Sequence, residues 1–351
     1  MSLPLRIVVA LAMVAGVLSP TSANAAQTLA QVQAKVRQLE EEATTAAEGA
    51  QEAKVKLAGL TKTLNGIKAK AEIQGQTVST LQRSLGVIAV EQYKSGGFGQ
   101  SFELLFSTDP TLYLSAAGSL DAITRRKSLQ LREFEAAQQR LNATTLTVND
   151  KIALVAAAEK KLAAQSAIAL SKLAEAEKLL SKLSKAERDR LAKLTEDEEN
   201  ADQKSSLEAA KSANGVSGRA GTALKYALQQ IGDRYVFGAA GTVTWDCSGL
   251  TMRAFQSAGV SLPHSSAAQS RLGKKVALNA LKPGDLLFYG RPVSHVGIYL
   301  GGGKMVHAPR SGSRVKVADS GSLGRKLWYR KRYTDRLCCL SGPKQRLLLW
   351  L

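Results

Sequence analysis

The stretch TWDCSGL, Thr244 to Leu250, decides how the second half of this chain folds and reacts. After it, apolar residues recur at helical spacing, at Leu250, Ala254, Phe255 and Ala258. The pattern predicts a helix that begins at Cys247, with Asp246 as its N-cap. The first turn of a helix carries free N–H groups and a partial positive charge, which favour a thiolate. A cysteine at this place is either a reactive nucleophile or a small buried hydrophobic side chain.

The first 25 residues have the features of a secretory signal peptide. Arg6 precedes an apolar run from Ile7 to Leu18, and small residues lead up to Ala25. We expect cleavage after Ala25 and a secreted, cell-wall-associated protein. A retained membrane anchor is the alternative, although the apolar run is short for a bilayer span.

The cysteine count indicates that Cys247 is unpaired. Secreted chains usually pair their cysteines, but the other two, Cys338 and Cys339, are adjacent and far away in sequence. No C-x-x-C spacing of the metal-binding kind is present. The segment that holds the pair, residues 334–351, fits no pattern: a disordered extension, a dimerising tail and an altered reading frame all remain open.

Residues 26–212 have the composition of long amphipathic helices. Apolar residues recur every three or four positions, as at Val32, Val36 and Leu39 and again at Leu173, Ala176, Leu180 and Leu183. Glycines, a proline and aromatic residues interrupt the period between residues 95 and 118. The sequence therefore predicts an antiparallel coiled-coil hairpin with its tip at 95–118. Such a hairpin is either a passive spacer or a regulatory or partner-docking element.

The composition changes after a small, flexible stretch at 213–221, which we interpret as a linker to a domain at 222–333. From Gly215 onward the chain has nine Lys and twelve Arg against five Asp and no Glu, a net +16 of the total +19. A strongly basic secreted domain favours anionic wall polymers or lipid head groups as partners, rather than nucleic acid. About half of these charges are equally explained as ordinary solvated surface.

Two histidines lie on a predicted β-hairpin. The runs from His295 to Leu300 and from Lys304 to Ala308 alternate as strands and are joined by three glycines. A turn centred on Gly301 would place His295 and His307 directly opposite each other on one face. One imidazole can then activate the thiol while the other orients it. Two alternatives remain: both histidines have structural roles, or they bind a metal with Cys247 as the third ligand.

Several sequence motifs occur in the same order as in a known protein family. The runs YVFGAAGTVTWDCSGLT, LPHSSAAQ, LKPGDLLFY and SHVGIYLGGGKMVHAP, within Ala220 to Tyr333, resemble the NlpC-type family of cell-wall cysteine peptidases. The resemblance extends to secreted peptidoglycan hydrolases of Gram-positive, actinobacterial type. It implies an α+β architecture: a papain-like catalytic domain, with the cysteine helix packed on an antiparallel sheet, that follows the coiled coil.

The resemblance also implies the catalytic roles. Cys247 is the nucleophile, His295 the general base and His307 the residue that orients it, with no cofactor. The family hydrolyses amide bonds in peptidoglycan stem peptides, typically between D-glutamate, through its side-chain carboxyl, and the diamino acid that follows. The expected function is therefore a secreted peptidoglycan endopeptidase in wall remodelling or daughter-cell separation.

Four further residues are implied to bind substrate. Tyr235 matches a tyrosine that lines the site and helps to polarise the scissile carbonyl. Asp246 and Ser248 match positions that contact the stem peptide, the aspartate meeting a free amine. His264 stands where relatives often carry an arginine, which puts the contact to a substrate carboxylate in doubt.

Two alternatives to a stem-peptide endopeptidase stay open: a non-catalytic wall-binding module, and an amidase or acyltransferase that uses the same thiol. In relatives with a coiled coil, the helices restrain or position the catalytic module until a divisome or membrane partner engages them. We therefore hypothesise that the coiled coil controls access to Cys247.

Overall fold

A computed structural model describes residues 28–94, 110–211, 216–321, 323 and 326–333. The predicted signal peptide and the tail at 334–351 lie outside these residues, as do parts of the predicted tip and linker. Within the described residues, no helix combines the length and the hydropathy needed to cross a bilayer.

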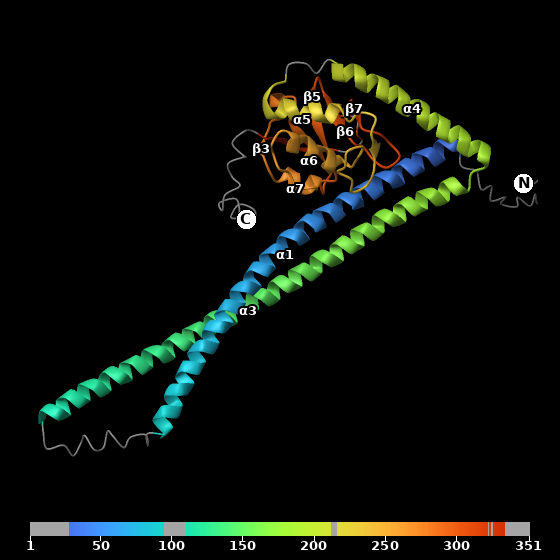
Figure 1. Cartoon of the computed structure of the whole chain (residues 1–351). Coiled ribbons are helices and arrows are strands. Elements are labelled where there is room, and N and C mark those ends of the chain that lie inside the picture. The colour runs from blue at the N-terminus through green and yellow to red at the C-terminus, as the bar shows by residue number, and fades with distance from the viewer. Residues whose placement is uncertain (1–27, 95–109, 212–215, 322, 324–325, 334–351) are drawn as a thin grey trace, which may run out of the picture.

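Two long helices form the predicted antiparallel hairpin (Figure 1). They are α1 (Leu29–Lys94) and α3 (Pro110–Ser181). At the end near the globular domain they bury the predicted apolar stripe, which comprises Val32, Val36, Leu39 and Ala176. Residues 110–118, predicted as part of the tip, instead begin α3, because proline is compatible with the first turn of a helix.

The globular domain is built on a six-stranded antiparallel sheet of order β3-β8-β4-β5-β6-β7. The strands are β3 (Lys274–Lys275), β4 (Leu286–Tyr289), β5 (His295–Gly301), β6 (Lys304–His307), β7 (Lys316–Asp319) and β8 (Leu327–Arg332). A short parallel pair, β1 (Arg234–Tyr235) and β2 (Thr244–Trp245), lies outside this sheet. A 3₁₀ turn, Leu278–Ala280, precedes β4.

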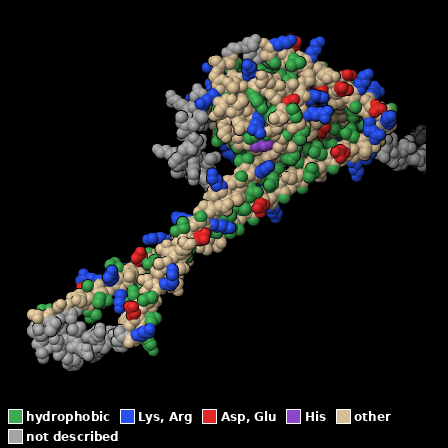
Figure 2. Space-filling model, viewed as in Figure 1, with side chains coloured by type: hydrophobic (Ala, Val, Ile, Leu, Met, Phe, Trp, Pro, Cys, Tyr) green, Lys and Arg blue, Asp and Glu red, His purple; other side chains and the backbone are tan. Residues whose placement is uncertain are grey.

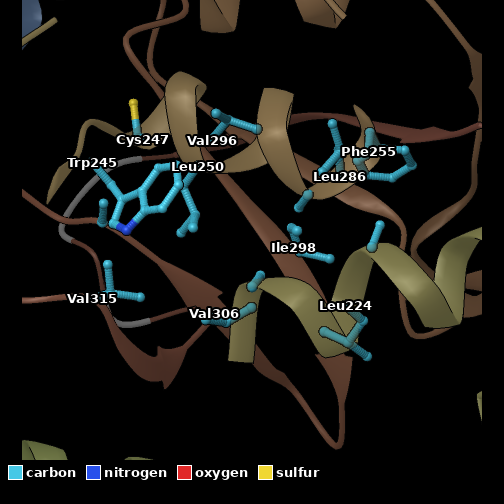
Figure 3. Packing of buried hydrophobic residues seen from close by; sticks show 14 of the residues in the cluster. Leu224, Trp245, Cys247, Leu250, Phe255, Leu286, Val296, Ile298, Val306 and Val315 are labelled. Atoms are coloured by element: carbon cyan, nitrogen blue, oxygen red, sulfur yellow. The ribbon is translucent and has the colours of Figure 1, made fainter. Parts of the chain in front are cut away.

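Three helices accompany the sheet: α5 (Gly218–Leu228), α6 (Cys247–Ser257) and α7 (Ser266–Ser270). The α6 residues Leu250 and Phe255 are fully buried in one cluster with Val296 and Ile298 of β5 (Figure 3). Burying large apolar side chains on both elements fixes the helix on the sheet. The α+β architecture predicted from the sequence is therefore confirmed, with the cysteine at the first residue of the packed helix.

The helical region departs from a single hairpin near residue 182. The chain turns at 182–184 and continues as α4 (Lys185–Lys211), which leaves α3 and lies beside the globular domain (Figure 1). Ala209 of α4 is buried in the same hydrophobic cluster as α6 and β5. The second half of α4 therefore packs as part of the globular domain, although its composition is that of the coiled coil.

The contact between α4 and the domain is made at the edge strand β7. Ser206 Oγ accepts a hydrogen bond of 2.8 Å from the backbone N–H of Val317. Lys316 Nζ lies 2.9 Å from Glu199 Oε1 and 2.6 Å from Asp202 Oδ2. The helix thus satisfies backbone and charged groups that an uncovered edge strand would expose.

Candidate active site

Cys247 stands at the start of α6, where the sequence predicts it. Asp246 is the N-cap, and its Oδ1 accepts a 2.6 Å hydrogen bond from the backbone N–H of Gly249. The N-cap explains why the helix begins here, since it satisfies one of the free N–H groups of the first turn. Cys247 is 0% exposed and belongs to the domain's main hydrophobic cluster.

The two histidines form a direct pair. His295 Nε2 lies 2.8 Å from His307 Nδ1, and the two rings are nearly perpendicular, at 82°. The prediction that they lie directly opposite was wrong by two positions, because the strands pair Ile298 with Val306, which centres the hairpin on Gly302 and not on Gly301. The rings still meet, since both lie on one face and Gly297 leaves room: a Cβ at Gly297 would stand 3.2 Å from the Cβ of His307.

This contact has a consequence for proton positions. Exactly one of the two facing nitrogens carries the shared hydrogen when both rings are neutral. If His295 donates through Nε2, its Nδ1 keeps a lone pair and can act as a base. His307 then orients the ring and fixes that tautomer, which is the role of the third residue in a nucleophile, base and orienter arrangement.

A carboxyl group from the coiled coil lies against the thiol. Glu48 of α1 accepts hydrogen bonds from Cys247 Sγ at 3.0 Å and from Ser248 Oγ at 2.8 Å, both at Oε1. Its Oε2 accepts two more, from Ser266 N at 2.8 Å and from Ser266 Oγ at 2.7 Å. Glu48 is only 2% exposed. The coiled coil therefore places an acidic residue inside the candidate site.

Neither Glu48 nor Ser266 was identified from the sequence. One signal was available, because residues 43–53 interrupt the leucine-and-valine stripe with small residues. In the structure most of this segment is buried, on several sides of the helix. Small residues all around a helix indicate close packing against more than one neighbour, and here the neighbours are α3 and the globular domain.

The thiol is neutral in this arrangement. Burial raises the pKa of Cys247 well above its ordinary value, and the nearby Glu48 and Asp246 carboxyl groups raise it further. A backbone hydrogen bond from Val296, which follows His295 on β5, acts in the opposite direction but is outweighed. The prediction that the helix start favours a thiolate is wrong for this closed arrangement, because burial and two acidic neighbours outweigh the helix terminus.

Tyr235 and Ser248 lie where the resemblance implies, beside the cysteine. Burial, with the neighbouring Cys247 as the next cause, raises the pKa of Tyr235 well above its ordinary value, so its hydroxyl keeps its proton. The Thr44 side chain of α1 lies near this hydroxyl and acts in the opposite direction on its pKa, although the two make no hydrogen bond of normal geometry. Tyr235 can therefore donate to a substrate oxygen, whereas the Ser248 hydroxyl is occupied by Glu48.

Asp246 and His264 form a pair of their own. His264 Nε2 lies 2.9 Å from each carboxylate oxygen of Asp246. Burial lowers the pKa of His264, but the hydrogen bond and charge of Asp246 outweigh it, so the pKa is raised. Asp246 is 1% exposed, its Oδ1 also accepts from the Gly249 N–H, and the Ser248 hydroxyl lies 3.2 Å from the same oxygen. Its oxygens are therefore occupied rather than open to a substrate amine.

A cavity of about 190 Å³ adjoins the histidine pair. Its lining includes His295 and His307, Arg310 from the loop that follows, and Glu41 from α1. Helix α1 thus borders this cavity as well as the thiol. Among the described residues, no three His, Cys, Asp or Glu side chains are grouped so as to hold a metal ion, so the alternative of a metal bound by both histidines and Cys247 gains no support.

Comparison with known proteins places this site in a family. The NlpC/P60 family model matches residues 232–334. The chain is 45% identical over 111 residues to the probable endopeptidase Rv2190c of Mycobacterium tuberculosis, covering 32% of this chain and 29% of that protein. It is 39% identical over 115 residues to the peptidoglycan endopeptidase RipA of the same organism, covering 29% of this chain and 24% of RipA.

A solved structure also matches about a third of the chain. The structure of Rv1477, a hypothetical invasion protein of Mycobacterium tuberculosis, is 36% identical and covers 33% of this chain and 62% of that chain, with a TM-score of 0.30. The aligned part of the present chain spans less than a third of the length of Rv2190c or RipA. Residues 232–334 of this chain are therefore an NlpC/P60 domain.

Proposed function

We propose that this protein is a secreted peptidoglycan hydrolase that cleaves an amide bond of the stem peptide by thiol catalysis. The observation that supports it most is the contact between His295 Nε2 and His307 Nδ1 at 2.8 Å. The backbone of Val296, which follows His295, makes a hydrogen bond to Cys247 at the first residue of α6. Relatives of this domain are named endopeptidases, and one is named a peptidoglycan endopeptidase. The proposed bond joins D-glutamate, through its side-chain carboxyl, to the diamino acid that follows.

The proposed reaction proceeds in two steps. His295 removes the proton from Cys247 as the sulfur attacks the amide carbonyl, and the carbonyl oxygen becomes an oxyanion. Backbone N–H groups at the start of α6 and the Tyr235 hydroxyl are the donors that stabilise this oxyanion. The protonated His295 then gives its proton to the leaving amine, which leaves a thioester on the enzyme. In the second step His295 activates a water molecule, which hydrolyses the thioester and restores the thiol.

The proposed setting is the cell wall outside the membrane. Figure 2 shows Lys and Arg side chains spread over the visible face of the globular domain and along the coiled coil, without one dominant patch. Such a surface suits anionic wall polymers through many weak contacts, and it gives no reason to invoke nucleic acid. Wall remodelling or daughter-cell separation, and a divisome or membrane partner for the coiled coil, are the roles we propose for the whole chain.

The test is digestion of purified peptidoglycan by the full-length mature protein, with the products identified by mass spectrometry. We expect new amino termini on the diamino acid, and none from Cys247→Ala. If the wild type and Glu48→Ala both bind wall polymers and neither releases a product, the protein is a binding module. Release at another bond that still requires Cys247 would identify an amidase or acyltransferase instead.

A further inference from the structure

We propose that Glu48 is a built-in inhibitor of this site: α1 inserts its carboxyl group among the donors that surround Cys247, and the site becomes available only when α1 withdraws. The proposal rests on the assignment of Cys247 as the nucleophile. It assigns the control of access to one residue of the coiled coil, rather than to the bulk of the helices.

Both oxygens of the Glu48 carboxyl group are fully hydrogen-bonded in the site. A buried glutamate is costly unless its oxygens are bonded, and here both oxygens accept two hydrogen bonds each. The donors come from two different helices, since Cys247 and Ser248 begin α6 and Ser266 begins α7. Three of the four donor groups are side chains, and all lie in the interior. Glu48 therefore occupies a formed polar site and does not merely lie across it.

Glu48 also blocks access to the sulfur of Cys247. Cys247 is 0% exposed, and its Sγ donates to Glu48. A polymeric substrate has to bring an amide carbonyl into contact with that sulfur. The thiol and the Glu48 carboxyl group cannot keep their contact while a substrate carbonyl takes the same place. Closure by α1 and catalysis at Cys247 are thus mutually exclusive.

Small side chains on α1 allow this helix to pack closely against the globular domain. Ala46 and Ala47 of α1 pack with Ala169 of α3 against Phe237 of the globular domain. These short side chains let the helix backbone come close enough for one glutamate to reach the interior. Figure 1 shows α1 running beside the globular domain along this part of its length.

Two ion pairs join α1 to the globular domain on either side of Glu48, one partly buried and one largely exposed. Glu40 pairs with Arg310 at 3.1 Å, and Glu52 pairs with Arg271 at 2.6 Å. The Arg271 side chain is 58% exposed, so this pair is largely screened by solvent. Helix α4 holds the domain through separate contacts at β7, so α1 can withdraw while the domain stays tethered.

The experiment measures how fast iodoacetamide modifies Cys247 in the full-length mature protein, by mass spectrometry of the peptide that carries it. Peptide-level detection separates this thiol from Cys338 and Cys339. We expect Glu48→Ala to accelerate modification by about tenfold to a hundredfold, because the variant removes all the hydrogen bonds that the buried carboxyl group makes in the closed state. Glu48→Gln keeps the size but replaces one acceptor oxygen by an amide NH₂ group, which cannot accept the hydrogen bonds made to that oxygen, and we expect an intermediate rate. Alanine is the strongest helix former, so α1 itself should persist.

The matched control is Glu52→Ala, one turn along the same helix. It removes the Arg271 and Lys161 contacts but leaves the thiol's partner in place. We expect its rate to stay within about fivefold of the wild type, as for an exposed ion pair. Equal rates for the wild type and Glu48→Ala would overturn the proposal, and so would equal acceleration by Glu52→Ala and Glu48→Ala.

Alkylation needs no peptidase activity, so this result is separable from the proposed function. Faster modification in Glu48→Ala without any release from peptidoglycan would support the inhibitory contact and contradict the peptidase. The wild type and Glu48→Ala could instead show equal alkylation rates and equal release from peptidoglycan. That result would support the peptidase and contradict the inhibitory contact.

Discussion

Glu48 and Cys247 are 199 residues apart in sequence, yet the thiol donates a 3.0 Å hydrogen bond to the glutamate carboxyl group. The contact joins the coiled coil to the first residue of the catalytic helix. It also explains why the cysteine is neutral and fully buried in a domain whose expected chemistry requires an exposed thiolate. If Cys247 is the nucleophile, we expect catalysis to require a second arrangement, in which this contact is broken.

The histidine pair leads to a prediction about catalysis. In the open Glu48→Ala background, His307→Ala should lower kcat by about 10²-fold or more and leave KM nearly unchanged, because the base loses its preferred tautomer. His307→Gln retains a side-chain acceptor and should recover part of the rate. Steady-state kinetics on a soluble stem peptide test this, and an equal loss in both variants would contradict a positioning role.

Closure should depend on pH. Burial, followed by the charge of Asp246, raises the pKa of Glu48 above its ordinary value of 4.5. At a pH between 4.5 and the raised pKa, Glu48 is therefore protonated in the closed state and ionised in the open state. Closure is strongest below 4.5 and weakens as the pH rises through the raised pKa. His264, Cys247 and Tyr235, which face Glu48, also have raised pKa values and favour closure at lower pH.

The measurement is the ratio of the Cys247 alkylation rates in Glu48→Gln and in the wild type, between about pH 5 and pH 8. Taking the ratio cancels most of the change in alkylation rate that comes from the pH-dependent thiolate fraction of Cys247 itself. We expect it to fall as the pH rises, because only the wild type loses closure through Glu48. A ratio that stays constant, or that rises with pH, would contradict the assigned direction.

The pair formed by Asp246 and His264 can be tested alone. Asp246→Asn keeps a side-chain oxygen for the Gly249 N–H, so the start of α6 should remain intact. The charge that raises the pKa of His264 is removed, and we expect that pKa to fall. Titration of the His264 ring by NMR checks this, and an unchanged pKa would mean that Asp246 does not control it.

The contact between α4 and β7 predicts a stability effect. Ser206→Ala leaves the buried N–H of Val317 without its acceptor, which should destabilise the globular domain by about 1–3 kcal/mol. The matched control is Ser205→Ala, because Ser205 is exposed and bonds only to the backbone of its own helix. Trp245 and Trp328 lie in this domain and no tryptophan lies before residue 215, so tryptophan fluorescence during urea unfolding reports on the domain without a signal from the coiled coil. Equal stability of the two variants would show that α4 does not support the sheet.

The parts of the fold that depend on local chemistry were predictable from the sequence. An N-cap aspartate and an apolar stripe locate the start of α6 at Cys247, and an alternating pattern around glycines locates the two histidine strands. The exact register was not predictable, because three consecutive glycines allow the turn to centre on Gly302 as well as on Gly301. The resulting offset of two positions keeps both histidines on one face.

Contacts between distant segments were not predictable. Glu48 looks like any other acidic residue of an amphipathic helix, and only the three-dimensional structure brings it to Cys247. The second half of α4 has the composition of the coiled coil, yet it packs on β7. A helical stripe shows that a helix packs but does not identify its partner.

The most direct measurement is the rate at which the full-length mature protein releases new amino termini from purified peptidoglycan. Three variants are compared with the wild type: Glu48→Ala, Glu52→Ala, and the double variant Glu48→Ala with Cys247→Ala. We predict that Glu48→Ala is faster than the wild type and Glu52→Ala is close to it, and that the double variant releases nothing. A Glu48→Ala rate equal to or below that of the wild type, or release by the double variant, would contradict a thiol peptidase closed by Glu48.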